Sequence, residues 1–455
     1  MLERIFALQE RHTTVKTEIL AGLTTFITMA YILFVAPNML GLAGMSKNAV
    51  LIATALGGGV VSIVVGLVAN YPICFAPGVG MLAFYSFGVV LGMGVPWQTA
   101  LGAVFISGIV FFVLTVTRIR QLIIAGIPAS LKVAITIGIG FFITIIGLKL
   151  SGLMTIRLSL LPDTVTAVAA HHGSALPSAV ETILEMGSIT NPEHLLSMFG
   201  LVFTAVLMAR KIQGSLLIGI IVTSILGYMT NIVSLPPDFT LLALPNFSDN
   251  AIGQLDIAGA LNMGLVTIIF TFTFAEFFDS MGTLIGTATK AGIADPQTGK
   301  FPGLGRALTA DAVGVAFGAV LGTSTITAFV ESAAGVGVGG KTGLTAVTCG
   351  VLFILSIAFS PLMGLIPNAA TTPVLILVGV LMMEPVRNID FSDLAEGFPA
   401  FMTIVLMPFT YSIANGIASG LVLYPFMKVL TGKAKEVHFI MYILAVLVII
   451  KYAFF

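Results

Sequence analysis

The chain has 455 residues, of which 57% are hydrophobic and only 9% are charged, and its 20 basic residues balance its 20 acidic residues. A soluble domain carries roughly 25% charged residues. This composition therefore excludes a soluble enzyme, a nucleic-acid-binding protein and a disordered scaffold. The 49 glycines and 33 phenylalanines are typical of a helical protein that crosses the lipid bilayer several times. Both cysteines, Cys74 and Cys349, lie in apolar segments, so we expect no structural disulfide, bound metal or cofactor.

Apolar stretches long enough to cross a bilayer recur along the whole chain, since a spanning helix needs about 20 such residues. The clear candidates are 19–40, 48–69, 97–117, 132–150, 197–209, 213–233, 343–360 and 438–455. Candidates that polar residues or glycines interrupt are 71–92, 258–288, 307–322, 323–341, 368–386 and 397–431. We expect about fourteen segments, although 397–431 is long enough for two short helices. Helices must dominate, because lipid cannot satisfy open backbone groups.

Basic residues indicate the orientation of these segments. Cytoplasmic loops of membrane proteins are enriched in Lys and Arg. The connections 151–195 and 234–257 contain Arg157 as their only basic residue, so we expect them outside the cell. The basic groups on the opposite side include Arg4, Arg11, Lys16, Arg118, Arg120, Arg210, Lys211, Lys290, Lys300 and Arg306. The N-terminus is therefore expected in the cytoplasm, whereas the topology of 397–455 stays open.

An internal repeat relates the two halves of the chain. Segment 125–140 is similar to segment 364–379, and the alignment pairs Pro128 with Pro367 and Gly140 with Gly379. Two further pairs of segments match at a similar offset and in the same order. About seven spans in each half is an odd number, so the halves must have opposite orientations in the membrane. Inverted repeats are typical of alternating-access transporters, which bind substrate at the midplane between interrupted helices.

Two segments do not read as plain helices. The stretch 74–84, CFAPGVGMLAF, contains Pro77 followed by Gly78 and Gly80, and the stretch 322–343 begins with alternating β-branched residues before helix formers appear at Glu331. We expect a broken helix in the first and a short extended stretch followed by a short helix in the second. Extended backbone at membrane depth is tolerated inside protein or beside a water-filled cavity, where it can bind a polar ligand. The alternative is a pair of kinked structural helices.

Four acidic residues lie within apolar segments, where an ionisable group is costly and is a functional candidate by default. Glu276 and Asp279 share one helical face, and two carboxylates so close favour a shared, exchangeable proton. Asp279 could instead be structural. Glu331 stands where the extended stretch becomes helix, so it faces a ligand or caps its own helix. Asp311 is expected to be structural.

The five histidines all lie outside the interiors of the apolar segments, so we expect a carboxylate to carry any transported proton. Motifs of metalloproteases, serine hydrolases and nucleotide-binding loops are missing from the sequence, which argues against an enzyme.

At these positions the sequence resembles the nucleobase–cation symporter family, and within it the azaguanine-type branch of purine permeases for adenine, guanine and hypoxanthine. The resemblance covers essentially the whole chain. It rests on AGLTTFITMAYILFVAP in the first span, FAPGVGMLAF in the third, FFDSMGTLIG in the eighth and TAFVESAAGVGVGGKTGLTAV in the tenth.

The resemblance implies an all-α polytopic fold of fourteen spans in two inverted seven-span repeats, with spans 3 and 10 broken by short strands that meet at the site. It also implies a core domain of spans 1–4 and 8–11 and a gate domain of spans 5–7 and 12–14. The corresponding boundaries are 1–117 and 258–364 for the core, and 118–257 and 365–455 for the gate.

The resemblance further implies the residues of the site. Glu276 and Glu331 match the substrate-binding carboxylates, while Phe329 and Val330 match strand residues that stack on and bond to the base. The expected substrate-binding set is Glu276, Glu331, Phe329, Val330, Ala30, Leu82, Ala83, Phe84, Thr273 and Ser332, and the proton-coupling pair is Asp279 and Glu276. Leu82 departs from the family, which commonly has an asparagine there, so the preferred base stays open.

The sequence therefore predicts a multi-pass protein of the inner or plasma membrane that imports purine nucleobases by proton symport. The alternatives are transport of another nucleobase, such as uracil or xanthine, or of an anion through the same inverted fold. The expected partners are the purine, the proton and the lipid bilayer, without nucleic acid. A homodimer is compatible with these features, and the sequence alone does not determine the oligomeric state.

Overall fold

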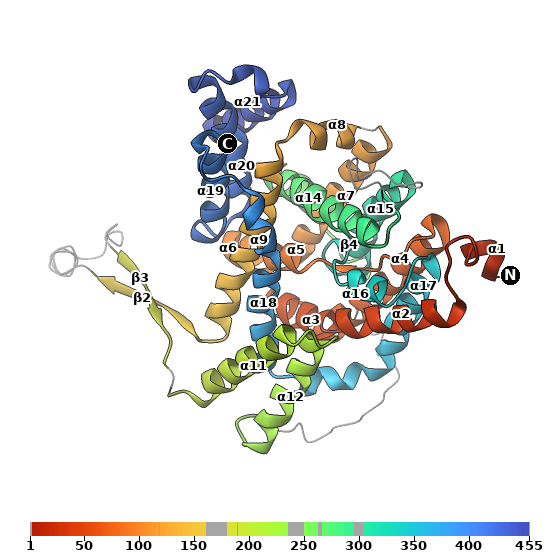
Figure 1. The fold of residues 1–455 in the computed structure, drawn as a ribbon. Helices are drawn as coiled ribbons and strands as arrows, with labels where there is room; N and C mark the ends of the chain where they lie inside the picture. The colour runs from red at the N-terminus through yellow and green to blue at the C-terminus, as the bar shows by residue number, and fades with distance from the viewer. Residues whose placement is uncertain are drawn as a thin grey trace.

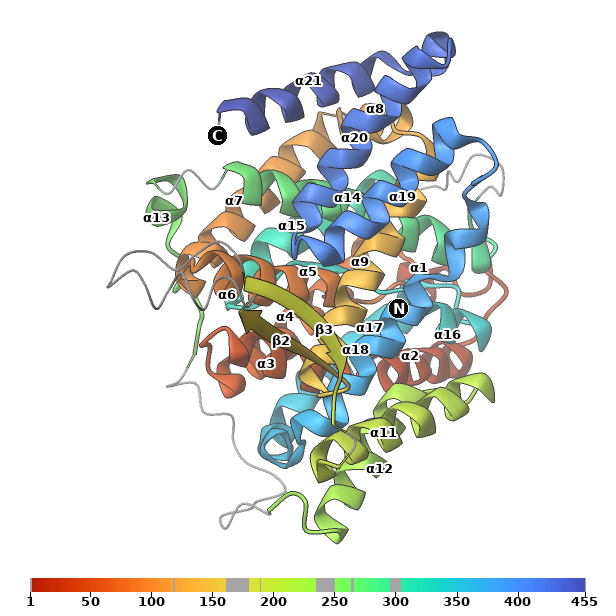
Figure 2. The ribbon, with the colours of Figure 1, turned by 90° about the vertical axis from the view of Figure 1, so that its left-hand side faces the viewer.

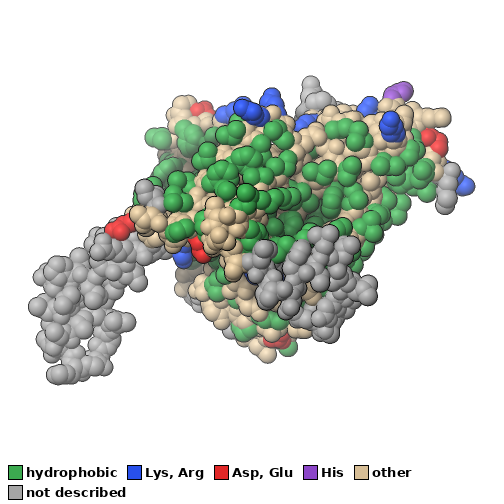
Figure 3. Space-filling model, turned by 90° about the horizontal axis from the view of Figure 1, so that it is seen from below, with side chains coloured by type: hydrophobic (Ala, Val, Ile, Leu, Met, Phe, Trp, Pro, Cys, Tyr) green, Lys and Arg blue, Asp and Glu red, His purple; other side chains and the backbone are tan. Residues whose placement is uncertain are grey.

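The computed structural model describes residues 2–117, 119–160, 180–188, 190–234, 250–262, 266–294 and 304–454. Within these residues, ten helical segments are long and apolar enough to cross a membrane, and four shorter apolar helices accompany them. Hydrophobic side chains cover much of the face seen in Figure 3, and several Lys and Arg side chains line one edge of it. The chain is thus a polytopic helical membrane protein, as the composition predicts.

The elements of the first half include one short strand and a hairpin. In chain order they are α1 (Leu2–Phe6), α2 (Val15–Met29), α3 (Ile32–Leu42), α4 (Lys47–Ala69), β1 (Phe75–Pro77), α5 (Val79–Ala83), the π-helix η1 (Phe84–Val90), α6 (Leu91–Met93), α7 (Trp97–Val116), α8 (Ile119–Gly126), α9 (Ala129–Leu150), β2 (Met154–Leu160), β3 (Val180–Met186), α11 (Pro192–Ala209) and α12 (Ser215–Met229).

The second half repeats much of this order. It contains α13 (Ile257–Asn262), α14 (Val266–Lys290), α15 (Leu304–Leu321), β4 (Ile326–Ala328), α16 (Ser332–Gly337), α17 (Gly343–Leu355), the 3-10 helix η2 (Ser356–Leu365), α18 (Asn368–Met382), the 3-10 helix η3 (Glu384–Asn388), α19 (Leu394–Phe409), α20 (Ile413–Leu430), the 3-10 helix η4 (Ala434–Glu436) and α21 (Phe439–Phe454).

Repeat-related residues meet in space. Pro128 and Pro367 both precede a long helix in extended conformation, so each sets the start of its helix, α9 or α18. These two helices pack together at Gly140 and Gly379, because a Cβ added to Gly379 would lie 2.5 Å from the Gly140 carbonyl oxygen. The aligned glycines thus let the two backbones approach closely.

Helix packing falls into two groups (Figure 1). In one, α2, α3, α4, α7, α14, α15, α16 and α17 pack on one another; in the other, α9, α11, α12, α18, α19 and α20 do so. The short linker helix α8 connects α7 of the first group to α9 of the second. Figure 2 shows α21 along the outer edge of the molecule, where it packs on α20 and α8.

The two short strands β1 and β4 join the halves of the chain inside the first group. They form an antiparallel pair in which Ala76 lies opposite Thr327, and all their residues are buried. The Gly78 N–H also donates to the Thr325 carbonyl at 3.1 Å, and the Phe329 N–H donates to the Cys74 carbonyl at 2.9 Å. Each strand therefore satisfies its backbone groups on the other.

The structure adds three details to the sequence-based prediction. The span predicted for 19–40 is present as the apolar helical segment Val15–Leu42, in which α2 gives way to α3 at Ala30–Tyr31, and Thr28 directs its hydroxyl back to the carbonyls of Thr24 and Thr25 just before this point. The connection 151–195 was expected as a loop, yet it contains the antiparallel hairpin of β2 and β3. Segment 397–431, for which the sequence left one span or two short helices open, forms two helices, α19 and α20.

Candidate functional site

Glu276 lies near the middle of α14 and is fully buried. Neither of its carboxyl oxygens has a hydrogen-bond partner among the described residues. Thr325 and Thr327 lie beside this carboxylate from the β4 segment, and the Thr325 hydroxyl is also without a partner. A buried carboxylate without a donor is costly, so this group is arranged to accept from a ligand or to carry a proton.

Glu331 follows β4 and stands at the start of α16. Its side chain does not cap that helix. It accepts instead a 2.6 Å hydrogen bond from the hydroxyl of Tyr31, a fully buried residue at the break between α2 and α3. Tyr31 was not predicted from the sequence, because the broken first span that presents it reads as a continuous apolar helix.

Asp279 lies one turn beyond Glu276 on α14 and is partly exposed. One of its carboxyl oxygens is 3.5 Å from the position that a Cβ on Gly78 would occupy, directly after β1. Asp311 and Glu331 are near enough to repel it electrostatically. The carboxylates of α14, α15 and the β4 segment therefore gather around the strand pair.

Asp311 lies on α15 and is fully buried. It accepts hydrogen bonds from the hydroxyls of Ser280 and Thr327, and forms an ion pair with Arg120 at 3.5 Å. The structural role expected for Asp311 agrees with these contacts. Arg120 was expected in a cytoplasmic connection; its side chain is instead buried, because Asp311 and two aromatic rings receive it.

The remaining predicted site residues contribute an aromatic ring, two hydrogen-bonded hydroxyls and three apolar side chains. Phe84 is fully buried and contacts the Phe272 ring at 5.0 Å between centroids. The Thr273 hydroxyl is occupied by the Ile269 carbonyl and by Ser107, and the Ser332 hydroxyl accepts from the Cys74 N–H at 2.9 Å. Ala30, Leu82 and Ala83 are buried apolar residues.

Phe329 and Val330, which the resemblance matches to strand residues, lie directly after β4 and not within it. β4 ends at Ala328, and Val330 lies in the turn that leads into α16 with 57% of its side chain exposed. Phe329 is buried, and its N–H donates to the carbonyl of Cys74, the residue just before β1. The strand-like sequence pattern continues to Val330, whereas the turn before α16 ends the pairing of β4 with β1 earlier.

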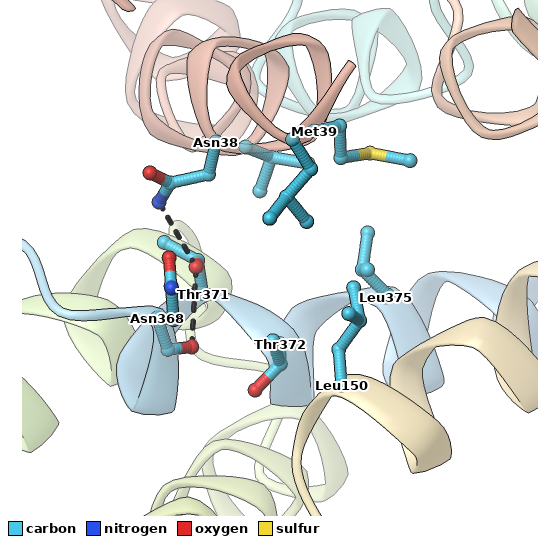
Figure 4. Close-up of a pocket in the computed structure, with 9 residues that line it drawn as sticks. Asn38, Met39, Leu150, Asn368, Thr371, Thr372 and Leu375 are labelled. Carbon is cyan, nitrogen blue, oxygen red and sulfur yellow. Dashed lines mark hydrogen bonds between the residues drawn. The ribbon is translucent and has the colours of Figure 1, made fainter. Parts of the chain in front are cut away.

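A cavity of about 60 Å³ lies apart from these carboxylates, between α3, α9 and α18 (Figure 4). Asn38 donates to the Thr371 hydroxyl across it at 3.1 Å, joining α3 to α18. The Asn38 carbonyl oxygen and the Thr372 hydroxyl have no partner among the described residues. The cavity thus marks a polar contact between the two groups of helices.

Comparison with known proteins identifies the family of the chain. The sequence pattern of the Permease family matches residues 16–419. The chain is 43% identical to the adenine permease AdeP of Escherichia coli, over 100% of this chain and 96% of that one. It is 41% identical to the guanine/hypoxanthine permease PbuG of Bacillus subtilis, over the full length of both.

Among solved structures, the fold is similar to the transmembrane domain of the cyanobacterial bicarbonate transporter BicA. The TM-score is 0.61 at 14% sequence identity, over 89% of this chain and 97% of that one. This likeness concerns the fold alone. The family match and the two full-length relatives confirm the resemblance seen in the sequence motifs, and the chain belongs to the Permease family of multi-pass membrane transporters.

Proposed function

We propose that the protein imports purine nucleobases, namely adenine, guanine or hypoxanthine, by proton symport with alternating access. The observation that carries this proposal is the full-length similarity to an adenine permease and to a guanine/hypoxanthine permease, together with the unpartnered Glu276 carboxylate. The family consists of membrane transporters, which also argues against an enzymatic role.

The substrate chemistry follows from the groups around the strand pair. A purine is flat, with N–H donors on its edge and an apolar face. The carboxylates of Glu276 and Glu331 are suited to accept from the edge, and the rings of Phe84 and Phe329 offer apolar surfaces. Buried polar groups of this kind reject analogues that lack the matching hydrogen-bonding group. Thr325, with its unpartnered hydroxyl, joins this set.

The proposed architecture has fourteen spans in two inverted repeats. The ten long segments, the helices starting at Val79, Ser215 and Leu394, and the β4–α16 segment together supply fourteen crossings, which leaves α21 at the periphery. The two packing groups support a core domain of 1–117 with 258–364 and a gate domain of 118–257 with 365–455. The N-terminus is assigned to the cytoplasm.

An anion transporter is the second candidate, because BicA shares the fold and carries bicarbonate. The acidic residues around β1 and β4 disfavour this alternative, since ionised Glu276 and Glu331 would repel an anion. The identity to BicA is also far below that to the purine permeases.

The substrate class is tested by uptake of radiolabelled adenine, guanine, hypoxanthine and uracil in cells that lack their own nucleobase permeases. We expect saturable uptake of at least one purine and little uptake of uracil. Uptake of uracil or bicarbonate in preference to all three purines would contradict the proposal.

A further inference from the structure

Arg120 is the largest fully buried polar side chain among the described residues, although it stands in a short linker helix. Its guanidinium lies over the Phe111 ring at 4.2 Å and near the Phe277 ring at 5.7 Å. One terminal nitrogen pairs with Asp311 at 3.5 Å and donates to Ser280 at 3.2 Å. The other two guanidinium nitrogens have no hydrogen-bond partner in the part of the chain that the structure describes.

A buried cation needs a compensating charge, since leaving one unpaired is strongly destabilising. The elements packed against α8 are α7, α14 and α21. No residue of α7 is charged. His438, just before α21, lies beside Gly126 at the far end of α8. Lys451 lies in the last turn of α21. The acidic groups near the guanidinium are therefore Asp311 of α15 and Glu276 of α14, with Asp279 one turn further.

The charges of this cluster do not balance by themselves. Three carboxylates, those of Glu276, Asp279 and Asp311, share one cation, whereas Glu331 is held separately by Tyr31. Asp311 has the direct ion pair and two hydroxyl donors, which favour its ionised form. Within the described residues Asp311 alone of the three has an ion pair, so the exchangeable proton is assigned to Glu276 and Asp279.

We propose that Arg120 is the counter-ion of this carboxylate cluster: it holds Asp311 ionised and sets the pH range over which Glu276 and Asp279 exchange the transported proton. Arg120 is a positioning residue, because it acts through the carboxylates and does not touch the substrate. The inference rests on the proposed proton symport. Arg120 lies on α8, the helix that joins the two groups of helices, so the ion pair connects the carboxylate cluster to this linker.

The test compares the pH profile of purine uptake in three variants, using whichever of radiolabelled adenine, guanine or hypoxanthine the unaltered protein accumulates. Arg120→Gln removes the cation, so the remaining carboxylates hold their proton to higher pH and the profile moves by about one pH unit or more to the alkaline side. Asp311→Asn frees the cation to act on Glu276, so the profile moves to the acid side. The double variant, which is neutral at both positions, returns towards the original profile.

Two controls separate this role from simple loss of structure. Arg120→Lys keeps the charge and is expected to keep the profile. Lys428 is also buried, in an ion pair with Glu396 at 2.8 Å in the other group of helices. Lys428→Gln should lower thermal stability without moving the profile. Unchanged profiles in both Arg120→Gln and Asp311→Asn, or shifts in the same direction, would overturn the proposal.

The melting temperatures of the substrate-free proteins test whether Arg120 and Asp311 form an ion pair, independently of transport. Each single variant leaves one buried charge alone, so both should melt below the double variant. A double variant that melts below both single variants would refute the pairing. If the unaltered protein transports purines with no dependence on pH, proton symport itself is wrong, while the melting comparison still decides the pair.

Discussion

The Glu331 carboxylate is held by a phenol from the first span, a contact that joins residues 300 positions apart. We expect Glu331→Gln to weaken purine binding by about 1.5–3 kcal/mol, the usual cost of losing a charged hydrogen bond. Tyr31→Phe removes the positioning donor and should cost less, about 0.5–1.5 kcal/mol. Equilibrium binding to purified protein measures both effects. Native affinity in correctly inserted Glu331→Gln protein would contradict a ligand contact.

Glu276 and Asp279 share a helix face and are expected to differ in role. Glu276 is fully buried with both oxygens unpartnered, so Glu276→Gln should abolish or strongly weaken binding while the protein still folds. Asp279→Asn should retain binding but lose uphill accumulation, because an amide cannot take up and release a proton. Binding and accumulation in liposomes test the pair. Uphill transport by Asp279→Asn together with normal binding by Glu276→Gln would reverse the assignment.

At the residue scale the sequence identifies the carboxylates but not their partners. Glu276, Asp279 and Glu331 are conspicuous because acidic residues are rare within apolar segments. Tyr31 and Arg120 are not, since their roles depend on which distant helices fold against them. An arginine at the end of a span ordinarily indicates a cytoplasmic loop, and only the tertiary structure reveals its carboxylate.

Close helix packing makes glycine a sensitive element of this fold. A Cβ on Gly379 would lie 2.0 Å from the Thr144 hydroxyl oxygen and 2.5 Å from the Gly140 carbonyl oxygen, so α18 would have to move away from α9. Gly379→Ala is expected to lower the melting temperature by several degrees, as overpacking costs about 1–3 kcal/mol. Gly305→Ala, near the start of α15 with open space around its Cβ position, should leave stability unchanged or slightly higher.

Thermal unfolding of the two variants in detergent provides this comparison. Equal melting temperatures would show that the α9–α18 contact tolerates a methyl group and would contradict the close approach of the repeat-related glycines.

At the scale of helices and strands, the sequence predicts those elements whose position follows from hydrophobic composition or from a proline. The long apolar helices follow from hydrophobicity, and the starts of α9 and α18 follow from Pro128 and Pro367. The break at Ala30–Tyr31 was missed because neither glycine nor proline marks it. The hairpin of β2 and β3 was missed because it lies in a connection, although its β-branched residues are typical of strands.

The whole molecule combines two groups of helices, which the linker helix α8 connects along the chain and a hydrogen bond beside the cavity connects in space. Asn38 and Thr371 join α3 to α18, and the strand pair joins the two halves within one group. Such an arrangement suits alternating access, in which one group moves against the other around a fixed site. The inverted repeat was suggested by the sequence offset, while the contact between the repeats required the folded chain.

Coupling of purine uptake to the proton gradient is the central claim, and proteoliposomes test it most directly. Purified protein is reconstituted with a buffered interior, and radiolabelled purine is added outside under an imposed inward proton gradient. The account predicts transient accumulation above the equilibrium level, which a protonophore abolishes and which an inward sodium gradient at equal pH does not replace. Accumulation that survives the protonophore and follows the sodium gradient would contradict it.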